Sequence, residues 1–202
     1  MKRKVGSVVG ILFLVVFVIY LSVTAISDLT NKEDAMTVRI DQATTILEVK
    51  HAINGIIPTG TEYYFIGVTA ETGDAYIIKG PKKWVTENFT QDCEAVNADG
   101  IVITGLRKRV SDYKVSNELA DRTSGLNGIQ LPYSSNYCID LNYKVNAFGK
   151  LILLVFSFVI AICIYVVGKR KEAMSQQTSK VLSFVLLVVS IVWLMLLLRV
   201  LR

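Results

Sequence analysis

Charged residues are missing from three long stretches of this 202-residue sequence. Residues 5–26 form a run of 22 without Asp, Glu, Lys or Arg, and residues 151–168 and 181–198 form two further runs of 18. Apolar runs of about 18 or more residues are typical of transmembrane helices. We expect this pattern to exclude a soluble enzyme, a fibrous protein and a disordered chain.

Histidine and cysteine are scarce, with one and three residues. A Ser-His-Asp or Cys-His arrangement would have to use His51, whose apolar neighbours indicate a partly buried structural role. A zinc site needs three or four ligands of the His, Cys or carboxylate type, and no glycine-rich phosphate loop of the required spacing is present. We therefore predict no catalytic residues, no metal site and no cofactor, and a protein that is not an enzyme.

Ionisable residues and proline are both absent from the three apolar runs, which argues against a transporter working alone. The runs do contain pairs of small residues four positions apart, Gly6 with Gly10 and Ser157 with Ala161. Such pairs let two helix backbones approach closely. They indicate helix packing, within this chain or with another, unless they reflect only the frequency of glycine in membrane helices.

Basic residues concentrate beside the apolar runs. Residues 27–149 contain 12 Lys and Arg against 16 Asp and Glu, a net charge of −4, although the whole chain carries +5. This is the positive-inside pattern rather than a nucleic-acid-binding surface. It predicts a multi-pass protein of the plasma membrane, with residues 1–4 and 169–180 in the cytoplasm, 27–149 outside and a short outer tail, 199–202. Two alternatives remain: the first run is a cleaved signal peptide, or the third does not cross.

The expected fold class is a membrane protein of three transmembrane α-helices, at 5–26, 150–168 and 181–198, with a small extracytoplasmic α+β domain at 27–149. Within that domain, residues 42–54 fit a helix or a strand about equally well. Aromatic and β-branched residues flanking the turn at 71–74 predict a hairpin of strands 62–69 and 75–79. Further elements are expected at 82–89 (helix), 100–110 (strand), 111–122 (helix, capped by Ser111) and 137–145 (strand).

The order of these elements has a family resemblance. A hairpin strand ending in Ile-Ile-Lys, a short helix containing Trp84, the strand Ile-Val-Ile-Thr-Gly and a following helix occur in that order. This arrangement, over residues 61–122, resembles small bacterial multi-pass membrane proteins with an extracytoplasmic domain of no assigned function. The resemblance implies a small α+β domain and brings no active site with it.

Two cysteines, Cys93 and Cys138, lie in the domain expected outside the membrane. An even number of cysteines in an oxidising compartment favours a disulfide, which would close a loop of about 45 residues. Two free thiols are the alternative.

Basic residues in two groups indicate contact with an anionic lipid or polymer surface, unless they are only solvated. They are Lys79, Lys82 and Lys83, and Arg107, Lys108 and Arg109.

The function that we expect is a membrane-anchored, non-enzymatic binding protein whose outer domain contacts a partner protein, a lipid or an envelope polymer. The alternative is an accessory subunit of a larger transport or signalling complex that acts through its transmembrane helices. The expected partners are membrane lipid and either a membrane protein or a second copy of the chain, and not nucleic acid.

Overall fold

The computed structural model describes residues 2–53, 57–126, 129–170, 177–178, 181–182, 184–185, 188–189 and 191–193. The chain divides into two compact units. The first, called here the helical unit, comprises Met1–Leu29 and Val145–Arg202. The second, called the sheet domain, comprises Thr30–Lys144.

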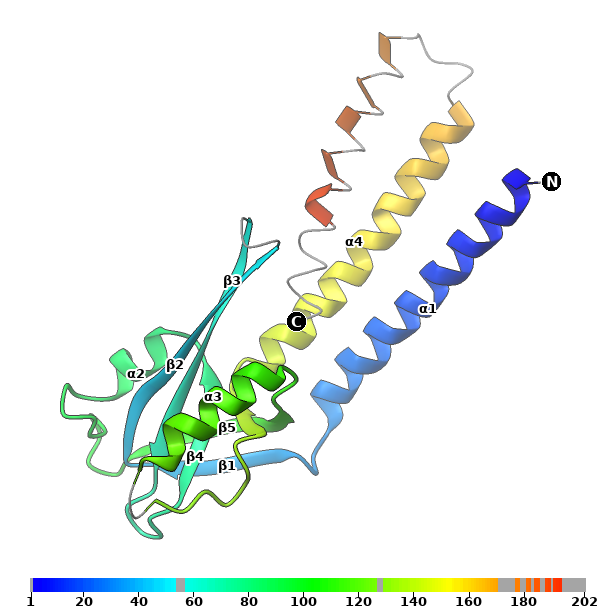
Figure 1. Cartoon of the computed structure of the whole chain (residues 1–202). Helices are drawn as coiled ribbons and strands as arrows, with labels where there is room; N and C mark the ends of the chain where they lie inside the picture. The colour runs from blue at the N-terminus through cyan, green and yellow to red at the C-terminus, as the bar shows by residue number, and fades with distance from the viewer. Residues whose placement is uncertain are drawn as a thin grey trace. The chain divides into compact units, whose positions relative to one another are not determined.

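The helical unit contains two long helices, α1 (Lys2–Thr30) and α4 (Tyr143–Arg170) (Figure 1), and short described helical pieces between residues 177 and 193. The sequences of both helices are mainly apolar and contain no proline, a residue that would interrupt a helix. The ammonium of Lys150 on α4 lies 2.9 Å from the carboxylate of Asp28 on α1. The indole N–H of Trp193 donates a hydrogen bond of 2.8 Å to the Ser157 hydroxyl, so polar as well as apolar contacts join parts of this unit.

The structure corrects the expected number of membrane spans. Among the described residues, one helix, Tyr143–Cys163, is long and apolar enough to cross a bilayer, and Val16–Thr30 is apolar but shorter. A span needs about 20 apolar helical residues in succession, and only half of the third apolar run, 181–198, belongs to the described residues. The prediction of three transmembrane helices is therefore wrong for the described chain. The multi-pass plasma-membrane topology, with a cytoplasmic N-terminus and residues 27–149 outside, depended on three crossings and is corrected with it.

A six-stranded sheet forms the second unit, in the order β1-β5-β6-β4-β3-β2. All neighbouring strands are antiparallel except β4 and β6, which pair in parallel. The expected hairpin is confirmed, because β3 and β4 pair from Tyr63–Gly80 to Val68–Ala75 around the turn. The strands are β1 (Ala35–Ile40), β2 (Gln42–Ile53), β3 (Ile57–Val68), β4 (Ala75–Gly80), β5 (Ile101–Arg109) and β6 (Tyr137–Asp140).

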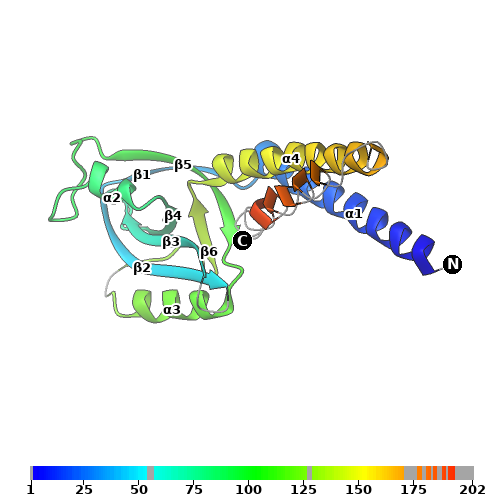
Figure 2. The same ribbon diagram turned by 90° about the horizontal axis from the view of Figure 1, so that it is seen from above.

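The sheet curls because its two edge strands are consecutive in the chain. Strands β1 and β2 occupy opposite ends of the strand order, yet only Asp41 separates them. Figure 2 shows β1 and β5 on one side, β2 on the other, and β3 and β4 between them. One bent stretch of chain therefore provides both edges, and the inner face of the sheet is enclosed at the Asp41 corner.

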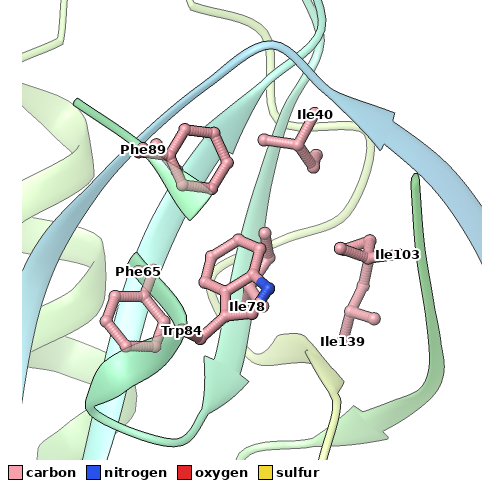
Figure 3. Close-up of a cluster of buried hydrophobic side chains, with 8 residues drawn as sticks. Ile40, Phe65, Ile78, Trp84, Phe89, Ile103 and Ile139 are labelled. Carbon is pink, nitrogen blue, oxygen red and sulfur yellow. The ribbon is translucent and has the colours of Figure 1, made fainter. Parts of the chain in front are cut away.

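Strand alternation divides the apolar residues between two faces. The inner face holds a core in which Phe65, Ile78 and Ile40 are fully buried, closed by Trp84 from α2 (Lys83–Asn88) (Figure 3). The outer face holds a second cluster that includes Leu47 and Tyr64. It is covered by α3 (Tyr113–Ser124), whose Val115 and Leu119 belong to this cluster.

Three local expectations change in the structure. Residues 42–54 could be read as helix or strand, and pairing with β3 selects the strand. The expected strand at 137–145 ends at Asp140, whose carboxylate accepts the Asn142 backbone N–H at 2.8 Å and turns the chain into α4. The N-cap of α3 is Asp112 rather than Ser111, because the Asp112 side chain accepts the Lys114 backbone N–H.

Candidate functional site

Charged and polar side chains from neighbouring strands meet on the outer face of the sheet. We call His51, Glu62, Tyr64 and Lys79 the Glu62 cluster. Glu62 is at its centre: Lys79 Nζ lies 2.5 Å from Oε1, and the Tyr64 hydroxyl donates to Oε2 at 2.9 Å. His51 Nε2 approaches Oε2 at 3.4 Å but makes no hydrogen bond with the described residues. The side chains of His51, Glu62 and Lys79 are each about four-fifths buried.

Two opposing effects set the ionisation of Glu62. Burial raises the pKa of its carboxyl, but the charge of Lys79 and the hydrogen bonds from Lys79 and Tyr64 outweigh burial and lower the pKa below its ordinary value. Burial, reinforced by the negative charge of Glu62, raises the pKa of Tyr64 far above its ordinary value. Glu62 is therefore a carboxylate and Tyr64 a neutral phenol at physiological pH.

Cys138 lies on the same face and is not activated for nucleophilic attack. Burial and the nearby charge of Asp140 raise the pKa of its thiol to about 12. A thiol nucleophile needs a lowered pKa, so Cys138 is protonated and serves as an apolar residue of the outer cluster. Within the described ranges, no three His, Cys, Asp or Glu side chains come close enough together to hold a metal ion.

A cleft of about 400 Å³ opens at the corner where β1 becomes β2. We call it the Asp41 cleft. The Asp41 carboxylate accepts the Ala70 backbone N–H at 2.7 Å through one oxygen and the Arg39 guanidinium at 3.0 Å through the other. The Ala95 backbone N–H donates to the Asp41 carbonyl at 2.8 Å, which holds the chain after α2 against the corner. The lining is about half polar and half apolar, and its charged side chains are of both signs: Arg39, Asp41, Gln42, Val68, Ala70, Glu94, Ala95, Asn97, Ala98 and Gly100.

Glycine is required at one position of this cleft. Gly100 has φ +72°, a conformation that other residues rarely adopt, and a Cβ there would lie 2.5 Å from Asp41 Oδ1 and 2.8 Å from Arg39 Nε. The Arg39–Asp41 pair can therefore sit against the backbone only because residue 100 has no side chain.

The six basic residues singled out in the sequence do not form one patch. Lys79 is held by Glu62, and Arg107 binds Asp34 at 2.7 Å. Lys108 alternates with Arg107 and Arg109 along β5, so it lies on the opposite face and comes within 3.9 Å of Asp140. Three of the six are exposed: Lys82, Lys83 and Arg109.

Cys93 and Cys138 are free thiols in the structure and lie in different surroundings. Cys138 is buried in β6 on the face that α3 covers. Cys93 lies in the loop after α2 with φ 66°, where its carbonyl accepts the Ala43 backbone N–H at the edge of β2. The structure therefore does not contain the Cys93–Cys138 disulfide that the even number of cysteines in this part of the sequence favoured.

The small-residue pairs lie on the two long helices. Gly6 and Gly10 belong to α1, but their surroundings are outside what the structure describes. Ser157 is buried on α4, where its hydroxyl donates to the Leu153 carbonyl and accepts from Trp193, and Ala161 is half-buried. Ser157 therefore contacts another part of the helical unit, in line with a packing role.

The sequence analysis did not predict the Glu62 cluster, although the sequence contained a signal for its Glu62–Lys79 ion pair. The hairpin turn fixes the register, which places Lys79 opposite Tyr64 and diagonal to Glu62. Diagonal neighbours in a sheet are within reach of long side chains, so this ion pair could have been found. His51 had no such signal, because it joins the cluster only once residues 42–53 are a strand.

No protein-family model, curated protein or solved structure matches this chain. Its function is therefore inferred from geometry and chemistry alone.

Proposed function

We propose that this chain is a membrane-anchored, non-enzymatic interaction protein. Helix α4 is the anchor, and the sheet domain provides the surface that binds a partner. The chain passes from β6 to α4 through two residues, Leu141 and Asn142.

The observation that carries the proposal is the surface of α4. Its side chains are apolar and mostly exposed, with Val145 at 70%, Ile152 at 68% and Val155 at 61%. Exposed apolar area costs about 25 cal/mol per Å² in water, and a contiguous exposed apolar surface marks a membrane or protein contact. The span Tyr143–Cys163 has 21 residues, which at about 1.5 Å per residue matches the hydrocarbon thickness of a bilayer.

Binding is favoured over catalysis by the state of the polar groups. The oxygens of Glu62 are occupied by Lys79 and Tyr64, and the Cys138 thiol is protonated. The Asp41 cleft, by contrast, has an open volume of about 400 Å³, and its walls combine charged side chains of both signs with small apolar ones. We assign partner binding to this cleft, with a polar peptide segment of another protein as its ligand.

Cysteine labelling in ruptured membranes tests the anchor. Val155 on α4 and Val102 on β5 are matched, since both are exposed valines, at 61% and 66%. In a background with Cys93 and Cys163 changed to serine and the buried Cys138 changed to alanine, we expect a membrane-impermeant maleimide to label V102C and not V155C, because lipid covers position 155. Both should label after denaturation. Equal labelling of the two variants in membranes would contradict the anchor.

A further inference from the structure

Strand β2 leaves one edge of the sheet open. It is the last strand in the order and pairs with β3 along its length. On its other side, only its first two residues are joined through the backbone to another segment, by the Gln42–Glu94 bridge and the hydrogen bond from Ala43 to Cys93, while α3 packs on Leu47 from the outer face. From Thr44 to Ala52, no described residue makes a backbone hydrogen bond to this side. An open edge is a template for pairing with another strand.

The charges on this edge are self-complementary. Glu48 and Lys50 are exposed, lie on the same face of β2 and flank Val49. If two β2 strands pair antiparallel around a two-fold axis at Val49, Glu48 of each copy lies opposite Lys50 of the other. Opposite charges directly across two strands stabilise the pair and like charges destabilise it.

The geometry of β2 limits this pairing to a short segment. The register with β3 shifts between Thr45 and Leu47, where a bulge bends the strand. The straight part that follows, from Leu47 to His51, supplies five residue pairs centred on Val49. The other edge strand, β1, has one charged residue, Arg39, and so has no two opposite charges that could face each other across a two-fold axis. Strand β1 therefore lacks the complementary pattern.

We propose that two copies of this chain associate through β2, antiparallel and centred on Val49, to form one continuous sheet. The interface is isologous, as two-fold symmetry requires, because each copy contributes the same residues. This inference goes beyond the proposed function and does not depend on membrane anchoring or on the Asp41 cleft.

Charge reversal in the full-length chain tests the inference. Donor-labelled and acceptor-labelled copies are reconstituted together in lipid vesicles, and energy transfer is measured as the protein-to-lipid ratio is varied. E48K and K50E each place like charges opposite each other at two symmetric positions, and we expect each to weaken association about tenfold. The double variant E48K/K50E restores opposite charges across the two-fold axis, so energy transfer should recover.

The matched control is E118K, which reverses an exposed glutamate that is likewise paired within its own chain, to Arg122 on α3. It should leave energy transfer unchanged. Far-ultraviolet circular dichroism checks that each variant keeps its strand content. Three results would each overturn the proposal: no energy transfer in the wild type, no loss in the single variants, or no recovery in E48K/K50E. Loss without recovery would show that Glu48 and Lys50 do not lie opposite each other across a two-fold axis at Val49.

Discussion

The two units of this chain bury their apolar residues to opposite extents. In the sheet domain, Phe65 and Ile78 are completely buried between strands and α2, whereas Ile152 and Val155 on α4 remain more than 60% exposed. The residue types are alike, so composition does not account for the difference. The sheet domain buries most of its large apolar side chains, with Val96 and Val102 among the exceptions, whereas α4 has an apolar surface along its length that the described residues leave exposed. We therefore propose that lipid surrounds α4 and that water surrounds the sheet domain.

The largest effect that separates the two units is expected from truncating apolar side chains. Phe65→Ala removes a ring that packs against Trp84 at a centroid distance of 5.3 Å, and should lower the free energy of unfolding of the sheet domain by about 3–5 kcal/mol. Ile152→Ala on α4 should change it by less than about 0.5 kcal/mol. Urea unfolding followed by Trp84 fluorescence, with Trp193 changed to Phe, measures both. Comparable losses in the two variants would show that Ile152 belongs to a folded core.

A smaller difference between the two units is expected when the pH is lowered. Acid should destabilise the sheet domain, which contains the Glu62 ion pair, and not α4, which contains no Asp or Glu. The folded-state pKa of Glu62 is lowered from 4.5, so its stabilising contribution is present above that pH and is lost as the pH falls through the folded pKa. Glu62→Gln should cost about 1–3 kcal/mol at pH 7, because Lys79 loses a charged acceptor.

Unfolding midpoints between pH 7 and pH 3 test this expectation. The difference between wild type and Glu62→Gln should shrink as the pH falls, while the helical signal of α4 stays constant. A difference that persists unchanged at pH 3 would mean that Glu62 stabilises the domain by packing rather than by charge.

Sequence patterns predicted the local elements of the sheet domain better than its long-range pairing. The β3–β4 hairpin was predictable because its turn lies between two runs of strand-forming residues. Strand β1 alternates apolar and polar residues from Met36 to Ile40, yet it follows an apolar run so closely that it was not recognised. The end of β6 was misplaced because Tyr143 and Val145 continue the alternation, although they begin α4.

The candidate sites were harder to predict because their residues are distant in sequence. In the sequence, Asp41 is indistinguishable from an ordinary polar residue. Its hydrogen bonds with Ala70 and with the loop after α2 arise only because β1 and β2 occupy opposite ends of the strand order. Asp140 and Cys138 acquire their surroundings only when β6 inserts in parallel beside β4. No local period signals such an insertion, since the partner strands lie about 60 residues away in the chain.

The most direct test of the account compares one residue type in the two environments. In Trp193→Phe protein, the remaining Trp84 reports the core of the sheet domain, and adding Phe158→Trp places a second indole on the exposed surface of α4. Reconstituted in vesicles of brominated lipid, the added Phe158→Trp emission should be strongly quenched and the Trp84 emission left unchanged. If the emission added at position 158 is not quenched, lipid does not cover α4, and the assignment of this helix as the membrane anchor is wrong.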